Sequence, residues 1–303
     1  MRKDRKMTAL FLSCILCGFL LRLISVNCIR NQLSEKTIET EAFRKLDYSE
    51  ETLEKIWLFA QENQLSGSEI LAQELILSGC ILDDFNPPSI QTIEKRRNLF
   101  LFCDRRAYES VVRACRAIWE DLVCFPVAGF SKEDSTFTFE DTWMDSRNYG
   151  GNRGHEGCDI FGTNNACGYY PVISVCEGYV EQIGWLPMGG WRIGIRGKSG
   201  GYFYYAHLSE YGKDFQIGDS VMAGQLLGFM GNSGYGEEGT TGQFPVHLHF
   251  GCYIRSRDGG EISVNPYPML CVLSKNIKYY TDERSRIQQE IKGVWKYGYT
   301  VVA

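Results

Sequence analysis

The pattern of apolar residues changes near residue 125, and this change limits the folds that the chain can adopt. Before it, apolar side chains recur at helical spacing, as Leu53, Ile56, Trp57 and Ala60 do. After it, short runs rich in Val, Ile, Tyr and Phe are separated by glycines, a pattern typical of strands. The sequence therefore predicts an α+β protein in which a small helical domain precedes a mostly antiparallel β domain.

The helical domain is expected over residues 45–124. Ser49 is a suitable cap for a first helix, a second helix is expected over 68–79, and a third starts near Ser89. Apolar stripes at this spacing are typical of a hydrophobic core, although a groove for a protein partner would carry the same pattern. The sequence does not identify such a partner.

The β domain is expected over residues 151–272, with a linker at 125–150 and a C-terminal extension at 273–303. Its predicted strands are the β-rich runs at 179–185, 191–196, 201–208 and 246–254. No glycine-rich dinucleotide or phosphate loop lies between a strand and a helix, so a nucleotide cofactor is not indicated.

Residues 1–30 have the features of a signal anchor. Four basic residues precede an apolar stretch from 7 to 26, close to the roughly 20 residues that a membrane span needs. No small-x-small cleavage site follows, which favours an uncleaved anchor over a cleaved signal peptide and secretion. Because basic flanks stay cytoplasmic, we expect a single-pass protein of the cell membrane with its β domain outside the cytoplasm.

Net charge bears on possible partners, and cysteine content bears on possible disulfides. The net charge of -5 comes with no long basic run beyond the N-terminus, which argues against a nucleic-acid partner. The chain has 12 cysteines. Cys158, Cys167 and Cys176 would either form disulfides in an oxidising exterior or pack as small apolar side chains, and their spacing does not decide.

All histidines lie beyond residue 154, in three short motifs. His247 and His249 are one residue apart in an extended run, so both imidazoles should lie on one face of a strand. With His155 and Asp159, four residues apart, the chain offers a carboxylate and imidazoles for zinc, leaving a fourth position for water. A closed structural zinc site is the weaker interpretation, because Cys158 should point away from Asp159.

These motifs, H-x-x-x-D, Tyr-x-His-Leu and H-x-H in this order, resemble those of the lysostaphin and LytM-type zinc peptidases, which cut bacterial peptidoglycan peptides. The resemblance covers about residues 125–272. It extends to short turn and strand segments at 171–172, 178–180, 218–221, 224–225 and 228–231. The resemblance implies a β domain of the lysostaphin and LytM type.

The resemblance further implies that His155, Asp159 and His249 bind Zn2+ and that His207 and His247 are catalytic. His247 would act as general base, while His207 would stabilise the oxyanion or orient water. The implied activity is hydrolysis of peptide bonds in peptidoglycan stem peptides or cross-bridges by metal-activated water.

Three questions stay open at this level. The alternative function is a catalytically silent scaffold or regulator that binds the cell wall with the same fold, although all five site residues are present. The helical domain would space the peptidase from the membrane, cover its groove or recruit a partner. The aromatic run 202–205, with Trp185 and Trp191, would either line a peptide groove or pack inside the β domain.

Overall fold

The computed structural model describes residues 33–131, 136–147 and 151–279, together with isolated positions nearer both ends. Residues 1–30, where we predict a signal anchor, lie almost entirely outside the described residues. Within the described part, no helix combines the length and the apolar character that crossing a membrane requires. The anchor therefore stays a prediction.

The N-terminal part is helical, and its long helices begin where the sequence predicts. The serine before each long helix caps it by accepting a hydrogen bond from the backbone N–H three residues further on. The helical elements are η1 (Thr37–Glu39), α2 (Glu41–Lys45), α3 (Glu50–Glu62), α4 (Gly67–Ser78) and α5 (Ile90–Trp119). α5 is interrupted at Asp104, whose backbone is extended.

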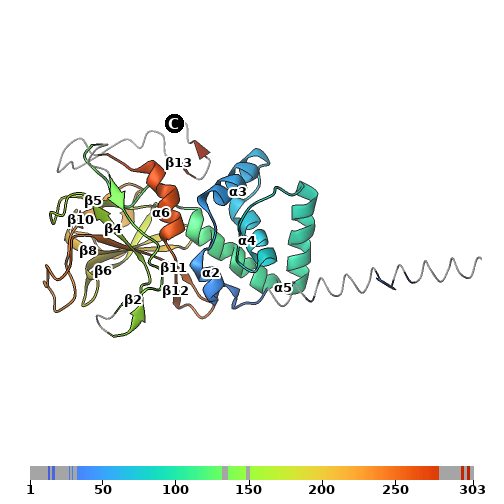
Figure 1. Cartoon of the computed structure of the whole chain (residues 1–303), viewed down its shortest axis with the longest axis horizontal. Coiled ribbons are helices and arrows are strands. Elements are labelled where there is room, and N and C mark those ends of the chain that lie inside the picture. Colours follow the sequence, from blue (N-terminus) through green and yellow to red (C-terminus); the bar gives the residue numbers. More distant parts are fainter. Residues whose placement is uncertain are drawn as a thin grey trace, which may run out of the picture.

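The β part is a mostly antiparallel sheet, as predicted, and lies to one side of the helices (Figure 1). Its strands are β1 (Phe137–Thr138), β4 (Cys158–Gly162), β5 (Pro171–Ile173), β6 (Gly178–Leu186), β7 (Gly190–Gly197), β8 (Tyr202–Tyr211), β9 (Ser220–Val221), β10 (Leu226–Met230), β11 (Leu248–Arg255) and β12 (Glu261–Val264). The main path runs β1-β4-β11-β8-β7-β6-β9, with β10 beside β5 and β8, and β12 beside β11.

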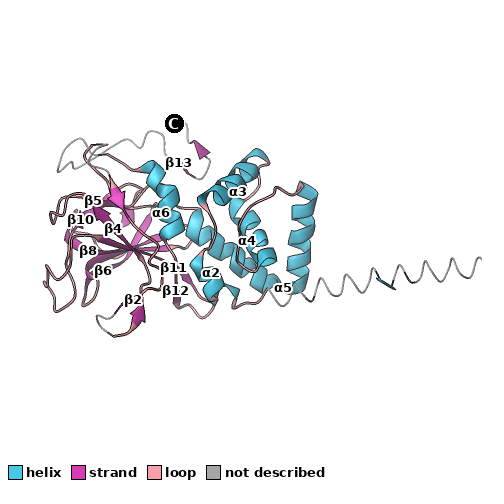
Figure 2. Cartoon of the chain, viewed as in Figure 1, coloured by secondary structure: helices cyan, strands magenta, loops and turns pink. Residues whose placement is uncertain are grey.

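Smaller elements complete the described chain. Two short hairpins are formed by β2 (Ser146–Arg147) with β3 (Arg153–Gly154) and by β13 (Trp295–Lys296) with β14 (Tyr299–Thr300). After the sheet come α6 (Tyr267–Leu273) and η2 (Ser274–Asn276). Figure 2 shows α6 on the side of the sheet nearer the other helices.

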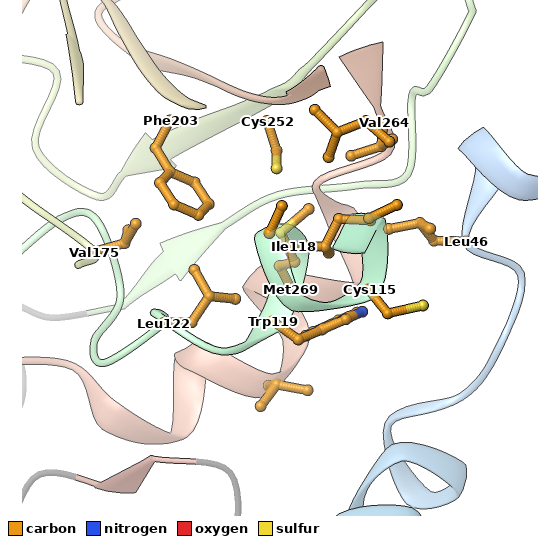
Figure 3. Close-up of a cluster of buried hydrophobic side chains, with 14 of the residues drawn as sticks. Leu46, Cys115, Ile118, Trp119, Leu122, Val175, Phe203, Cys252, Val264 and Met269 are labelled. Carbon is orange, nitrogen blue, oxygen red and sulfur yellow. The ribbon is translucent and has the colours of Figure 1, made fainter. Parts of the chain in front are cut away.

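The helices and the sheet share one hydrophobic core (Figure 3). Trp119, at the end of α5, is fully buried, and the same core contains Phe203 of β8 and Cys252 of β11. α5 packs against β11, on the sheet face into which these two side chains point. The predicted domain boundaries stay predictions, but the packing is continuous across residue 124.

The three cysteines considered for local bridges are free thiols. Cys158 and Cys176 are buried, whereas Cys167 is exposed. Burial raises the pKa of the buried Cys158 and Cys176 thiols above the ordinary range, because the thiolate loses its hydration. These two side chains therefore act as small apolar groups in the core.

Candidate active site

Two neighbouring strands and the segment before one of them bring the predicted metal ligands together. Asp159 on β4 lies directly opposite His249 on β11 in the antiparallel register. Their Oδ1 and Nδ1 atoms are 3.0 Å apart. Nε2 of His155, which precedes β4 and is buried, lies 3.1 Å from each of these two atoms.

The three donor atoms fit a zinc ion. Tetrahedral zinc with bonds of about 2.0–2.2 Å to nitrogen and oxygen separates its ligand atoms by about 3.3–3.6 Å. The triangle of donor atoms has sides of 3.0, 3.1 and 3.1 Å, slightly tighter than that spacing. Three protein ligands on one side leave the fourth position open for water or substrate.

Gly157, midway between two of these ligands, is required by close packing. A Cβ at this position would lie 2.4 Å from Cε1 of the His249 ring and 2.9 Å from the Phe250 carbonyl oxygen. Any side chain would therefore displace the His249 imidazole or the strand that carries it. This explains why a glycine stands between His155 and Asp159.

Thr142 and Arg147 hold the ligands from outside. Thr142 Oγ1 lies 2.9 Å from His155 Nδ1 and can accept its proton, which leaves the Nε2 lone pair for a metal. Arg147 Nη2 donates to Asp159 Oδ2 at 2.9 Å. In the metal-free protein, a His155 proton on Nε2 would instead be donated to Asp159, and Nδ1 would accept from Arg147 Nη2, which lies 2.9 Å away. In that state burial alone would raise the pKa of Asp159, but hydrogen bonds from His155 and His249 lower it well below its usual range.

A β-bulge aims His207 at the site. Opposite the single residue Arg192 of β7, strand β8 has two residues, Ala206 and His207. His207 has a φ of 62°, an uncommon conformation for a residue other than glycine. Strict alternation would place its imidazole on the same face as Tyr205, which is buried in the core.

His207 and His247 lie side by side with matching hydrogen bonds. Their ring centroids are 4.8 Å apart. Nδ1 of His207 lies 2.8 Å from the Ser233 carbonyl oxygen, and Nδ1 of His247 lies 2.9 Å from that of Pro245. A carbonyl oxygen only accepts, so each ring carries its proton on Nδ1 and keeps a free lone pair on Nε2.

Burial keeps both of these imidazoles neutral. It lowers the pKa of His207 to about 3, helped by the neighbouring His247 and His249. Burial also lowers the pKa of His247. His247 Nε2 lies 3.7 Å from Asp159 Oδ1, so its free lone pair borders the metal-binding triangle. The structure therefore brings all five predicted site residues to one place.

An open groove with a volume of about 610 Å³ contains all five residues. Tyr202 and Tyr204 of β8 line it, whereas Phe203 and Tyr205 are buried on the opposite face, as alternation along a strand requires. Trp185 and Trp191 contact each other edge to face and do not line it. The described helical residues 33–124 contribute nothing to the groove lining.

Comparison with known proteins identifies the family. The model for Peptidase family M23 matches residues 153–266. A crystal structure from Ruminococcus gnavus ATCC 29149, provisionally described as a glycyl-glycine endopeptidase lytM, is 40% identical. The match covers 81% of this chain and 95% of that chain, with a TM-score of 0.68. The chain belongs to peptidase family M23.

Two curated relatives each match less than half of the chain. The L-Ala–D-Glu endopeptidase of Bacillus subtilis (strain 168) is 47% identical over 136 residues, which are 44% of this chain and 40% of that protein. Lysostaphin from Staphylococcus simulans is 31% identical over 118 residues, which are 38% of this chain and 21% of that protein. These matches span less than half the length of either relative.

The similarity to the Ruminococcus gnavus structure extends beyond the M23 peptidase region. A match over 81% of the chain is longer than residues 125–303, which are fewer than two thirds of the 303 residues. It therefore includes part of the helical region. That region packs on the back of the sheet in the M23 protein described here, away from the groove.

Sequence reasoning missed the residues that support the M23 site. Thr142 and Arg147 lie in the polar stretch that we expected to be a linker, where no spacing rule connects them to His155 or Asp159. Ser233, which accepts the proton of His207 through its carbonyl oxygen, carries no side-chain signal for that role. Only the fold brings these three residues to the site.

Proposed function

We propose that this protein is a zinc-dependent endopeptidase that hydrolyses a peptide bond of peptidoglycan stem peptides or cross-bridges. One observation carries the proposal. In a chain of peptidase family M23, the donor atoms of His155, Asp159 and His249 form a triangle suited to zinc, and two neutral histidines flank it in an open groove.

Zinc would supply the electrophile. A zinc ion held by these three residues would polarise the scissile carbonyl and make water acidic enough to lose a proton near neutral pH. The chain contributes the fixed geometry of the three ligands. Thr142 and Arg147 keep His155 and Asp159 in orientation. They bond the atom of each ligand that does not face the metal, His155 Nδ1 and Asp159 Oδ2.

His247 is our candidate for the general base. Its Nε2 is unprotonated and borders the triangle, while its Nδ1–H is fixed on the Pro245 carbonyl oxygen. It would accept the proton of the attacking water and then deliver that proton to the leaving amine nitrogen as the C–N bond breaks. One imidazole would thus act first as base and then as acid.

His207 has a different task in this proposal. Because its Nδ1–H is bonded to the Ser233 carbonyl oxygen and its pKa is lowered to about 3, its Nε2 accepts a hydrogen bond at neutral pH. An accepting nitrogen suits the orientation of water or of a substrate N–H better than the stabilisation of an oxyanion. We therefore favour the orienting role.

The bond between L-Ala and D-Glu is our candidate for the scissile bond. The supporting observation is the 47% identity to a relative named for cleaving that bond, compared with 31% identity to lysostaphin. Peptidoglycan lies outside the cytoplasm, so this substrate also requires export. Residues 1–30 would provide it, as a signal anchor or as a cleaved signal.

The test is mass spectrometry of peptidoglycan fragments released by the purified protein. We expect new L-Ala carboxyl termini and D-Glu amino termini, which disappear after zinc chelation and in His247→Ala. A parallel metal assay establishes zinc content. If the folded, zinc-bound protein released nothing from several wall types, endopeptidase activity would be ruled out and the silent cell-wall-binding scaffold would replace it.

A further inference from the structure

Arg192 on β7 places unpaired guanidinium atoms at the groove. Its Nε and Nη1 are buried and have no hydrogen-bond partner among the described residues. Its Nη2 makes one long contact, 3.4 Å to Gln182 Oε1. Buried N–H groups are nearly always paired, and leaving a charged donor unpaired is unfavourable. Neither atom is accessible in this conformation, so an acceptor in the groove that Arg192 lines would pair with the guanidinium once the side chain turns toward it.

Neighbouring arginines have carboxylate partners, which sets Arg192 apart. Arg196, two residues further along β7, pairs with Glu181 and Glu261. Arg147, across the groove, pairs with Asp159. Among the ion pairs of the described residues, none involves Arg192. Of the arginines that line the groove, Arg147 has a carboxylate partner, whereas Arg192 and Arg153 have none among the described residues. Of these two, Arg192 is the one whose strand lies in the main sheet.

Arg192 lies in the same cross-strand row as the metal ligands. Asp159 of β4 is opposite His249 of β11, which is opposite Ala206 of β8. Arg192 of β7 follows next, opposite the bulge that contains Ala206. Adjacent strands are about 4.8 Å apart, so the Arg192 backbone is about 10 Å from that of His249.

The distance between the two residues matches a short peptide segment. Ala206, between them in the row, is buried and does not line the groove, whereas Met188 and Gly189, which precede β7, do. An extended peptide advances about 3.3–3.6 Å per residue, so about 10 Å corresponds to no more than three residues. The Arg192 side chain shortens the distance further, which places its guanidinium beside a substrate residue close to the scissile bond.

We infer that Arg192 binds a free carboxylate on the substrate residue that follows the scissile bond. This rests on the proposed function and gives it a substrate class. A D-Glu residue has two carboxyl groups, and the one that does not continue the chain stays free as a carboxylate. The planar guanidinium fork binds a carboxylate through two parallel hydrogen bonds, which a neutral amide cannot match.

The test compares two synthetic peptides. One is N-acetyl-L-Ala-γ-D-Glu-L-Lys amide, and the other carries a carboxamide in place of the free D-Glu carboxylate. Calorimetry measures their binding to zinc-loaded His247→Ala protein, in which neither peptide is consumed. We expect the acid to bind about 10- to 100-fold more tightly than the amide, the range for a hydrogen-bonded charged group.

Two further variants test whether Arg192 causes the preference for the acid peptide. Arg192→Gln in the His247→Ala background should abolish the preference for the acid while leaving amide binding nearly unchanged. Arg153→Gln removes another groove-lining arginine whose Nε lacks a partner, and it should keep the preference. Equal or undetectable binding of the two peptides, or loss of the preference in Arg153→Gln alone, would overturn the inference.

Cleavage by the wild-type protein is measured in parallel and tests the proposed function separately. If the acid is preferred through Arg192 but neither peptide is cut, the carboxylate site stands and the endopeptidase proposal does not. If both peptides are cut at equal rates and bind equally, the endopeptidase stands and the role of Arg192 does not.

Discussion

Asp159 Oδ1 and His249 Nδ1 lie 3.0 Å apart, although 90 residues separate them in the chain. Antiparallel pairing of β4 with β11 places the two residues opposite each other. A slip of one residue in this register would turn His249 to the other face of the sheet. The candidate metal site therefore depends on strand pairing as much as on the three residues themselves.

A metal assay should distinguish the proposed zinc ligand His249 from His207, which we place outside the ligand set. We expect His249→Ala to lose stoichiometric zinc and activity together, because it removes one corner of the donor triangle. His207→Ala should retain zinc and still lose activity, because its ring borders the triangle without belonging to it. Metal content by mass spectrometry beside peptide cleavage makes the comparison, and zinc loss in His207→Ala would contradict our assignment.

The residues outside the triangle should affect zinc affinity. Thr142→Val removes the acceptor of the His155 Nδ1 proton, and Arg147→Gln removes the positively charged donor that pairs with Asp159 Oδ2. We expect each change to weaken zinc binding by about 10- to 100-fold, measured by competition with a chelator. Thr138→Val, at an exposed position on β1, is the matched control and should leave the affinity unchanged.

Ser233 should be important for stability as well as for orientation. Its buried Oγ donates to the Leu208 carbonyl oxygen at 2.6 Å and accepts from the Trp191 N–H at 3.0 Å. Both backbone groups adjoin the bulge that aims His207. Ser233→Ala leaves them unpaired, so we expect a loss of about 1–3 kcal/mol in unfolding free energy, measured with urea. An unchanged midpoint would show that water replaces the hydroxyl.

The metal-free protein should be destabilised in acid. Burial lowers the pKa of His155, His207 and His247 in the folded state, so below the unfolded value of about 6.5 the unfolded chain binds more protons. The contribution of these histidines to the unfolding free energy should therefore be fully present above about pH 6.5 and should decrease as the pH falls. For His207 the decrease should continue down to its folded-state pKa of about 3.

Urea unfolding with a chelator present, at several pH values, measures this slope. His207→Asn, which tolerates the positive φ, should have a shallower slope than the wild type. A slope that is equal in both proteins would exclude His207 as a source of the acid sensitivity.

The shared core should make the helices and the sheet unfold together. Trp119 is fully buried between the helical region and the back of the sheet (Figure 3), so Trp119→Ala should cost about 3–5 kcal/mol. During urea unfolding, far-ultraviolet circular dichroism and tryptophan fluorescence should report one and the same transition. Leu58→Ala, at a position that is 55% exposed, is the control. Two separate transitions would indicate that the parts fold independently.

Local patterns were sufficient to predict most of the helices and strands and the shared face of the H-x-H pair. Serine caps marked the starts of α3 and α5, and alternation in the H-x-H run placed His247 and His249 on one face with Leu248 in the core. These features depend on residues a few positions apart, so helix and strand periodicity specifies them. The resemblance of the histidine motifs then indicated the family, which the comparisons confirm.

The sequence by itself thus indicated the family and a mostly antiparallel β domain with additional helices, and it predicted five site residues that the fold brings together. Only the tertiary structure decided how these residues work together: the bulge that turns His207 toward the groove, the hydrogen bonds of Thr142 and Arg147, and the row that leads to Arg192. The physical reason is that hydrogen bonds and strand register join residues far apart in the chain. No local spacing encodes which distant groups will meet once the sheet has formed.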